Sequence, residues 1–351
     1  MSTRRDVWRI DRAGSLTRLS RRSEDLADPA PGQARVAVRS VGLNFADLAA
    51  CLGLYSATPR ESFIPGLEFA GVIDAVGPGR AGDGRPRPGD LVAGVTRFGG
   101  YATAVNAGLD YLWPIRPGWS FSEAAALPVQ GLTAWYGLVY KGGVRRGDVV
   151  LVQSAAGGVG LHALSILASV GARTIAAVGH ESKRQWLIEH RGLSPGQIIV
   201  RHRGRFGADL DRALAAIGAS GCDLVFDAVV GPYFQPAYDR LRPEGRMVVY
   251  GAADLMPSGA RVNYLRLAAG YVRRPRVDPL RLITENRSVL GFNLIWLFDR
   301  VDELAVGRAA LDALLTCPPF VGRRFPFAEA PAAMRHLQSG QSVGKVVLMV
   351  D

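Results

Sequence analysis

The sequence predicts an α/β protein with a β-rich first part followed by a parallel sheet that helices cover on both faces. Three observations carry this prediction. Short apolar or alternating runs stand between Gly- and Pro-containing turns up to about residue 127. Apolar strands then alternate with helical stretches from residue 128 to residue 297. A glycine-rich turn at 155–160 joins one such strand to one such helix. The 351 residues are enough for two domains.

The β-rich part contains three predicted strands and one short helix. Residues 35–39 alternate between polar and apolar side chains, as a half-buried strand does. Residues 72–76 and 91–95 are short apolar runs between turns, and residues 77–89 have the composition of a loop. The short helix is expected over residues 44–51.

The middle part contains repeated strand–helix units. Residues 149–152 form a continuous apolar strand, a helix is expected over 159–170, and the next strand covers 174–178. Further strands are expected at 198–200, 224–227, 247–250 and 289–292. This alternation is typical of a doubly wound parallel sheet.

The chain ends with two helical stretches and a strand at 345–350. The alternating character of that strand suggests that it rejoins the first domain. We therefore predict one domain made of residues 1–127 and 298–351, and a second made of residues 128–297.

Composition and charge narrow the class of protein. The three cysteines form no CxxC pair, so neither a disulfide framework nor a structural zinc cluster is supported. The net charge of +11 comes from scattered arginines without a nucleic-acid-binding motif, so we expect no nucleic-acid partner. An anionic cofactor or substrate would explain part of this charge. No secretory signal or membrane span is evident, and a cytoplasmic enzyme is expected.

The strongest chemical signal is the turn at 155–160, which reads AAGGVG, a G-x-G-x-x-G pattern with alanine in the first place. Gly157 lets the backbone approach a pyrophosphate, Gly160 lets the helix pack on the strand, and the helix N-terminus offers free N–H groups. We predict a dinucleotide site in which Ala156, Gly157, Gly158 and Val159 contact the cofactor. The alternative is a tight strand–helix turn without a ligand.

The end of the second strand indicates which dinucleotide binds. A carboxylate there would hold the ribose hydroxyls of NAD. This chain has Gly179 instead, which leaves room for a 2′-phosphate that Lys183, Arg184 and, after the next strand, Arg201 would neutralise. We therefore predict NADPH. Glu181 argues against this prediction, and the alternative is a helix N-terminus with solvated basic residues.

Seven segments match a known family in order and spacing: VGLNFADLAACLGLY (41–55), PGLEFAGVI (65–73), GGYA (99–102), AAALPVQGLTAWYGL (124–138), AAGGVG (155–160), SVLGFNL (288–294) and GKVVL (344–348). Together they resemble the zinc-independent quinone-oxidoreductase branch of the medium-chain dehydrogenases/reductases. Residues 263–298 look most similar to the subgroup of the synaptic vesicle amine-transport protein and its bacterial relatives. The resemblance implies a GroES-like catalytic domain, a Rossmann domain, NADPH and a homodimer.

The positions that hold zinc ligands in related enzymes carry other residues in this sequence. Zinc members of this superfamily carry Cys where this chain has Leu43 or Asn44, and His where it has Leu67. None of the five histidines pairs with a cysteine at ligand spacing. We therefore expect no catalytic metal.

Asn44 and Tyr55 fall where the family has its active-site Asn and Tyr. The resemblance implies that Asn44 positions the nicotinamide ribose or the substrate oxygen, and that the Tyr55 hydroxyl donates a hydrogen bond or a proton. The alternatives are a helix N-cap for Asn44 and a packing role for Tyr55. A second tyrosine of some quinone reductases corresponds to Ala49, which suggests a roomier pocket.

Three further residues are expected near the nicotinamide by the same resemblance: Thr133, Phe292 and Leu294. The alternatives are a Thr133 hydroxyl bonded within its own helix and a Phe292 ring that only packs in the core. The apolar strand at 289–293 is expected at the edge of its sheet, where a two-fold partner would continue the sheet and form a homodimer.

These observations predict an NADPH-dependent, zinc-independent oxidoreductase that transfers hydride to a quinone or an α,β-unsaturated carbonyl, with a place in secondary metabolism. Two alternatives stay open. One is a nucleotide-binding carrier or interaction protein that keeps the fold, and the other is a biosynthetic cyclase without net redox change.

Overall fold

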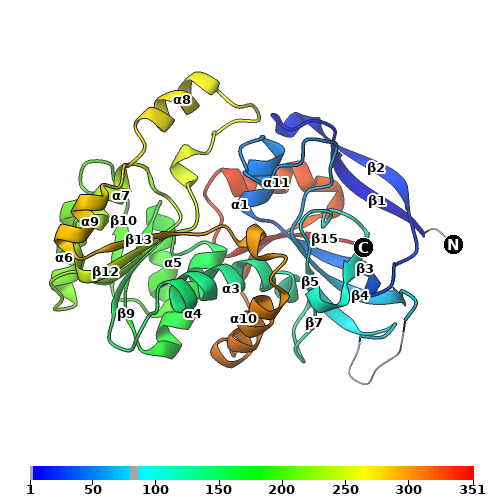
Figure 1. The fold of residues 1–351 in the computed structure, drawn as a ribbon, viewed down its shortest axis with the longest axis horizontal. Helices are drawn as coiled ribbons and strands as arrows, with labels where there is room; N and C mark the ends of the chain where they lie inside the picture. Colours follow the sequence, from blue (N-terminus) through cyan, green and yellow to red (C-terminus); the bar gives the residue numbers. More distant parts are fainter. Residues whose placement is uncertain (1–2, 80–85) are drawn as a thin grey trace.

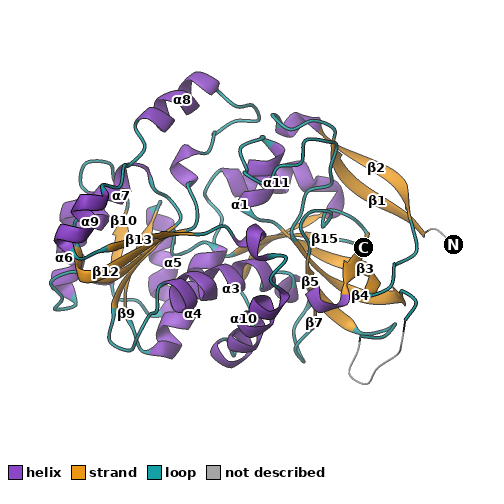
Figure 2. Cartoon of the chain, viewed as in Figure 1, coloured by secondary structure: helices purple, strands orange, loops and turns teal. Residues whose placement is uncertain are grey.

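The computed structural model describes residues 3–79 and 86–351. Two sheets of different kinds lie in the two halves of the molecule (Figure 1). Helices surround the sheet on the left of the view, whereas strands, loops and short helices together cover the sheet on the right (Figure 2). This arrangement confirms the predicted α/β class with a β-rich part and a helix-covered part.

The β-rich sheet has seven strands among the described residues, with β3 at its centre. Its strands are β3 (Gln33–Gly42), β4 (Glu68–Val76), β5 (Leu91–Val95), β6 (Ala104–Gly108), β7 (Leu112–Pro114), β14 (Val321–Pro326) and β15 (Lys345–Met349). β3 pairs antiparallel with β4, β6 and β15. The predicted C-terminal strand therefore joins the sheet of the N-terminal part. Of the loop predicted at 77–89, residues 80–85 lie outside the described residues.

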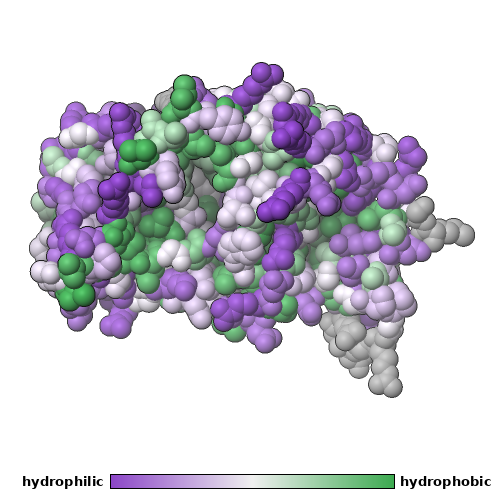
Figure 3. All heavy atoms as spheres, turned by 45° about the horizontal axis from the view of Figure 1, so that its top comes forward, coloured by the Kyte–Doolittle hydropathy of each residue, from purple (hydrophilic) through white to green (hydrophobic). Residues whose placement is uncertain are grey.

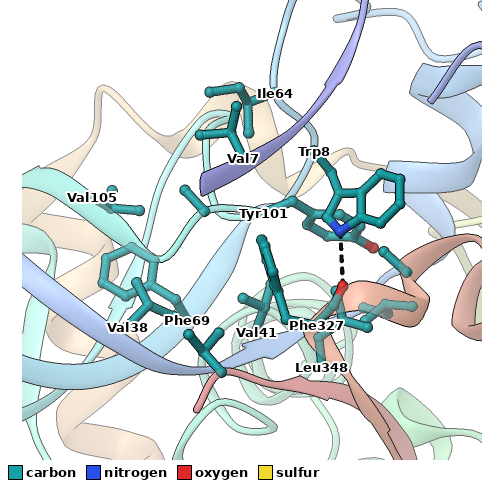
Figure 4. Packing of buried hydrophobic residues seen from close by; sticks show 14 of the residues in the cluster. Val7, Trp8, Val38, Val41, Ile64, Phe69, Tyr101, Val105, Phe327 and Leu348 are labelled. Atoms are coloured by element: carbon teal, nitrogen blue, oxygen red, sulfur yellow. Dashed lines mark hydrogen bonds between the residues drawn. The ribbon is translucent and has the colours of Figure 1, made fainter. Parts of the chain in front are cut away.

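A hairpin of β1 (Thr3–Ile10) and β2 (Leu19–Leu26) covers the core of this sheet. Val7 and Trp8 are buried, and the Trp8 indole Nε1 donates to the carbonyl of Phe327 at 2.8 Å (Figure 4). The sequence pattern does not indicate this hairpin, because its arginines hide the apolar side chains. Several of those arginines form ion pairs there; Arg5 and Arg9, for example, share the carboxylate of Glu24.

The second sheet is parallel throughout, with the order β10-β9-β8-β11-β12-β13. Its strands are β8 (Val149–Gln153), β9 (Arg173–Val178), β10 (Ile198–Val200), β11 (Cys222–Asp227), β12 (Leu241–Val249) and β13 (Ser288–Gly291). β9 and β10 lie on one side of β8, whereas β11, β12 and β13 lie on its other side, so the strand order changes direction between β8 and β11. The carboxyl ends of the strands at such a switch point form a ligand-binding crevice. All six predicted strands are present, although β12 begins six residues before the predicted start.

The described helices are α1 (Phe45–Cys51), α2 (Phe121–Ala124), α3 (Pro128–Trp135), α4 (Gly158–Val170), α5 (Glu181–Arg191), α6 (Phe206–Ala216), α7 (Phe234–Tyr238), α8 (Tyr264–Val272), α9 (Pro279–Glu285), α10 (Val301–Leu314) and α11 (Ala330–Gln338). Separate apolar clusters on the two faces of the parallel sheet contain α4 on one side and α6 on the other. α10 packs on α3 through Leu311. We propose that the domains divide as predicted, with α10 resting on the 128–297 domain.

Candidate active site

Unpaired polar atoms mark the switch point of the parallel sheet. β8 ends at Gln153 and the adjacent β11 ends at Asp227, and both side chains are fully buried. The Nε2 atom of Gln153 and the Oδ2 atom of Asp227 have no hydrogen-bond partner. Burial raises the pKa of the Asp227 carboxyl. Buried polar groups without partners cost free energy. The carboxyl ends of β8 and β11 are therefore suited to a ligand that supplies the missing hydrogen bonds.

The glycine-rich turn has the geometry of an anion site. Gly157 is the N-cap of α4, and no side chain caps the N–H groups of the first turn. A Cβ on Gly160 would stand 2.4 Å from the carbonyl oxygen of Ser154, so only glycine allows α4 to pack this closely on the turn. A Cβ on Gly157 would meet only that same oxygen within 4 Å, at 3.3 Å, so its other side is open. The turn therefore offers free N–H groups to a phosphate.

Ala156 and Gly158 of the same turn contact residues from other elements of the site. The carbonyl of Ala156 accepts a hydrogen bond from the N–H of Gly344 at 2.8 Å. A Cβ on Gly158 would stand 1.7 Å from the Oε1 atom of Gln130, so this glycine makes room for the Gln130 side chain on α3. Val159 follows in the first turn of α4 and is partly buried.

Two cations stand at the end of β9, where Gly179 follows the strand. A Cβ on Gly179 would lie 3.4 Å from a guanidinium nitrogen of Arg201. Arg201 donates to the Oε1 atom of Gln153 at 3.3 Å, which ties it to the switch point. Burial, together with the nearby Arg201 charge, lowers the pKa of Lys183 to about 8. An anion between Lys183 and Arg201 would relieve this repulsion.

The other two charged residues of this segment bind each other. Arg184 donates to the Glu181 carboxylate at 2.7 Å. Glu181, which argued against a phosphate site in the sequence, is therefore neutralised by its neighbour. Arg184 is occupied in the same way.

The Asn44 amide lies in a buried polar network. Its Nδ2 donates to Glu68 Oε1 at 2.8 Å. Its Oδ1 accepts from Lys345 Nζ at 2.9 Å and from Gln130 Nε2 at 3.4 Å. Asn44 also occupies the N-cap position of α1, where the Asp47 side chain accepts from its backbone N–H as in a capping box. The backbone of Asn44 thus marks the start of α1, while its side-chain amide is hydrogen-bonded within the buried polar network.

Asp47 extends the network by one helical turn. Its Oδ2 accepts from the Asn44 backbone N–H at 2.8 Å and from the Tyr101 hydroxyl at 3.3 Å. Complete burial raises the pKa of Asp47 to about 7, although the hydrogen bond from Asn44 opposes the shift. Burial also raises the pKa of Tyr101 well above its usual value, so this hydroxyl stays protonated.

The Tyr55 hydroxyl connects the two halves of the molecule. It donates to the Oδ1 atom of Asn293, just past β13, at 2.7 Å. Burial raises the pKa of Tyr55 to about 12, so the hydroxyl is protonated at neutral pH. Asn293 in turn donates to the Ser56 hydroxyl at 3.2 Å. Tyr55 is therefore fixed by a polar contact as well as by packing.

The remaining predicted cofactor residues lie in the core around this contact. The Thr133 hydroxyl donates to the Val129 carbonyl of its own helix at 2.7 Å. Phe292 packs edge-on against Tyr136, with ring centroids 5.1 Å apart. Leu294 packs against the same apolar cluster. Thr133 and Phe292 thus make the contacts expected of their alternative roles.

Metal ligands do not gather among the residues that the structure describes: no group of three or more His, Cys, Asp or Glu side chains could hold an ion there. His162 is buried, and burial lowers its pKa to about 4; its Nε2 donates to the carbonyl of Ala126 at 3.1 Å. Leu43 and Leu67 are buried apolar side chains. Over the same described ranges, no helix is long and apolar enough to cross a bilayer.

Three residues of the site were not among those predicted from the sequence: Glu68, Lys345 and Asn293. Glu68 and Lys345 each interrupt an apolar stretch, and Lys345 is one of only three lysines in the chain. A charged residue in a buried strand needs a partner, so both could have been noted as a candidate pair. Asn293 lay within a quoted motif but carried no distinguishing signal.

The fold and the crevice together define the class of protein. Residues 30–137 match the alcohol dehydrogenase GroES-like domain, and residues 198–348 match the zinc-binding dehydrogenase domain. The chain belongs to the medium-chain dehydrogenase/reductase superfamily, as its motifs predicted. The β-rich sheet is therefore GroES-like, and the six-stranded sheet is Rossmann-like.

Within the superfamily, the chain is similar to the human synaptic vesicle membrane protein VAT-1 homolog, with 33% identity over 96% of this chain and 84% of the relative. Among solved structures, it is similar to the quinone oxidoreductase of Thermus thermophilus, studied also as a complex with NADPH (31% identity, TM-score 0.74, 98% and 99% of the two chains). It is also similar to the CurK enoyl reductase (26% identity, TM-score 0.79, 99% of each chain).

Proposed function

We propose that this protein is an NADPH-dependent, zinc-independent reductase that delivers hydride to a quinone or an α,β-unsaturated carbonyl. The observation that carries the proposal is the pair Lys183 and Arg201 beside Gly179, next to the glycine-rich turn at the switch point. The similar proteins agree with it, because one is a quinone oxidoreductase studied with NADPH and another is an enoyl reductase.

The residues present fit this cofactor along the whole crevice. The N–H groups of the turn formed by Ala156, Gly157, Gly158 and Val159 would hold the pyrophosphate. Gly179 would leave room for the 2′-phosphate, and Lys183 and Arg201 would neutralise it. The nicotinamide half would lie against Asn44, Thr133, Phe292 and Leu294. When bound, NADPH supplies a hydride from its nicotinamide ring.

The chain's own donors would then stabilise the charge that develops on the substrate oxygen. The Asn44 amide nitrogen carries two hydrogens and gives one to Glu68, so the other is available to an oxygen in the crevice. The Tyr55 hydroxyl keeps its proton at neutral pH and can turn from Asn293 to that oxygen. Fixed donors aimed at a developing oxyanion are an effective replacement for a metal ion. Leu43 and Leu67 provide no ligand atoms.

A homodimer belongs to the same proposal. β13 is the edge strand of the parallel sheet, and Leu280 and Ile283 on the neighbouring α9 are 73% and 77% exposed. Green hydrophobic areas lie over this half of the molecule in Figure 3, whereas hydrophilic side chains gather toward the β1–β2 end. A two-fold partner would continue the sheet and cover α9. Light scattering at micromolar concentration should give twice the chain mass; a monomer would contradict the proposed assembly. A cytoplasmic location remains part of the proposal.

The test begins with binding and then follows turnover. NADPH fluorescence should change on mixing with the protein, and NADPH oxidation should follow when a panel of enones and quinones is added. Oxidation with at least one acceptor supports the reductase. Binding without oxidation of any acceptor would favour the carrier protein or the non-redox cyclase, and no binding would remove the cofactor as well.

A further inference from the structure

The Glu68–Lys345 ion pair lies beneath the candidate active site and takes no direct part in the proposed chemistry. The two side chains are 0% and 1% exposed. A Cβ on Gly42 would come within 2.8 Å of both Glu68 Cγ and Lys345 Cε, so a glycine in β3 makes room for the pair. Removing two charges from water costs more than packing apolar side chains of the same volume. Such a pair therefore calls for an explanation other than stability.

Glu68 binds three elements of the site at once. Its Oε1 accepts from the Asn44 amide at 2.8 Å and from Lys345, while its Oε2 accepts from the backbone N–H of Val129 at 2.8 Å. Val129 is in the first turn of α3, the helix that carries Gln130 and Thr133. One carboxylate thus holds Asn44 and caps the helix that is expected to face the nicotinamide.

Lys345 completes the arrangement from the other side. Its Nζ donates to Asn44 Oδ1 at 2.9 Å, so the Asn44 amide has a carboxylate at its nitrogen and an ammonium at its oxygen. Only one orientation of the amide satisfies both charges. The preceding residue, Gly344, donates its N–H to the Ala156 carbonyl at 2.8 Å. Lys345, the first residue of β15, therefore contacts the amide, and Gly344 just before this strand contacts the glycine-rich turn.

We propose that Glu68 and Lys345 are positioning residues, which fix the Asn44 amide and the first turn of α3 relative to the glycine-rich turn. This inference rests on the proposed function for its catalytic consequence. Glu68 binds one N–H of the Asn44 amide and Lys345 binds its oxygen. Only while both contacts hold can the second N–H of this amide point toward a substrate oxygen. Positional errors of about 1 Å cost on the order of 100-fold in rate.

The test uses the double variant Glu68→Gln/Lys345→Met in the full-length chain. A single Lys345→Met substitution would leave a buried, unpaired carboxylate and endanger folding, whereas the double variant is neutral. We expect kcat to fall about 10–100-fold, with little change in the NADPH dissociation constant. The matched control is Arg5→Met/Glu24→Gln, which likewise removes one positive and one negative charge, here from the hairpin, and should keep wild-type kcat.

A double-mutant cycle with Asn44→Ala separates positioning from general stabilisation. If the pair acts through Asn44, adding Glu68→Gln/Lys345→Met to Asn44→Ala should lower kcat little further. Losses that multiply would overturn the proposal, and so would a full wild-type kcat in the double variant.

Two readouts do not depend on turnover. The emission of bound NADPH should shift equally in Asn44→Ala, in the double variant and in the triple variant. A crystal structure of the double variant should show the Asn44 amide rotated or α3 displaced. An unchanged amide and an unchanged α3 would overturn the positioning role. If wild-type protein oxidises no NADPH with any acceptor, the reductase proposal fails, and these two readouts still decide the role of the pair.

Discussion

Replacing Lys183 with methionine tests the proposed 2′-phosphate site. A charge-assisted hydrogen bond contributes about 1.5–3 kcal/mol, so Lys183→Met should weaken NADPH binding by roughly 10–150-fold. NADH lacks the 2′-phosphate, and its affinity should change little. The matched control is Arg184→Met on the same helix, because Arg184 is bound to Glu181 and should not contribute.

The pH dependence of binding gives a second measure of the same contact. Burial and the Arg201 charge lower the pKa of Lys183 to about 8, so the free protein loses this proton as the pH rises through 8. The phosphate binds the charged form, so the NADPH affinity should be highest below this value and fall by up to about tenfold per pH unit above it. NADH binding should show no such slope.

Fluorescence titrations of both nucleotides at pH 7 and pH 9 measure these effects. Lys183→Met should reduce the preference for NADPH to what Arg201 alone provides, and it should abolish the pH dependence of NADPH binding near pH 8. An equal loss of affinity for NADPH and NADH would refute the assignment, because it would mean that Lys183 supports the fold or another part of the cofactor.

Three further predictions concern the reaction and the fold. Tyr55→Phe should lower kcat by about 10²–10³-fold and leave NADPH affinity nearly unchanged, because a fixed donor to a developing oxyanion acts in the transition state. Full activity of this variant in steady-state assays would mean that Tyr55 only lines the pocket. Burial raises the pKa of Asp47 from 3.8 to about 7, so the folded protein keeps a proton there that the unfolded chain releases. The free energy of unfolding should therefore fall as the pH rises from 4 to 7, by up to about 1.4 kcal/mol per unit, and Asp47→Asn should remove this slope in denaturant titrations; identical slopes would contradict the shift. A chelator should leave reductase activity intact, and elemental analysis that finds one zinc per chain would count against the metal-free site.

The sequence predicted the parts of the fold that have local signals. The strand at 149–152, the AAGGVG turn and the helix after it are adjacent in the chain, so their pattern could be recognised directly. The hairpin of β1 and β2 was missed because its charges are paired across the strands, and a pattern of exposed arginines gives no hint of a buried Val7 and Trp8. The early start of β12 was missed because Arg242, Pro243 and Glu244 look like a turn.

The network beneath the site could not be predicted in the same way. Lys345 and Glu68 are 277 positions apart, and the Tyr55–Asn293 contact spans 238. Such contacts arise only when β15 pairs with β3 and when the two halves of the molecule meet. The resemblance brought attention to Asn44 and Tyr55, but only the folded chain shows that Glu68, Lys345 and Asn293 hold them.

The most direct test of the central claim follows the hydride itself. NADPH carrying deuterium at the transferring position of its nicotinamide ring is incubated with the protein, an enone that supports turnover, and a chelator. The reductase account predicts deuterium at the β carbon of the product and a solvent proton at the α carbon. A product without the label, or a cofactor that stays bound and fully labelled in the presence of every acceptor, would contradict it.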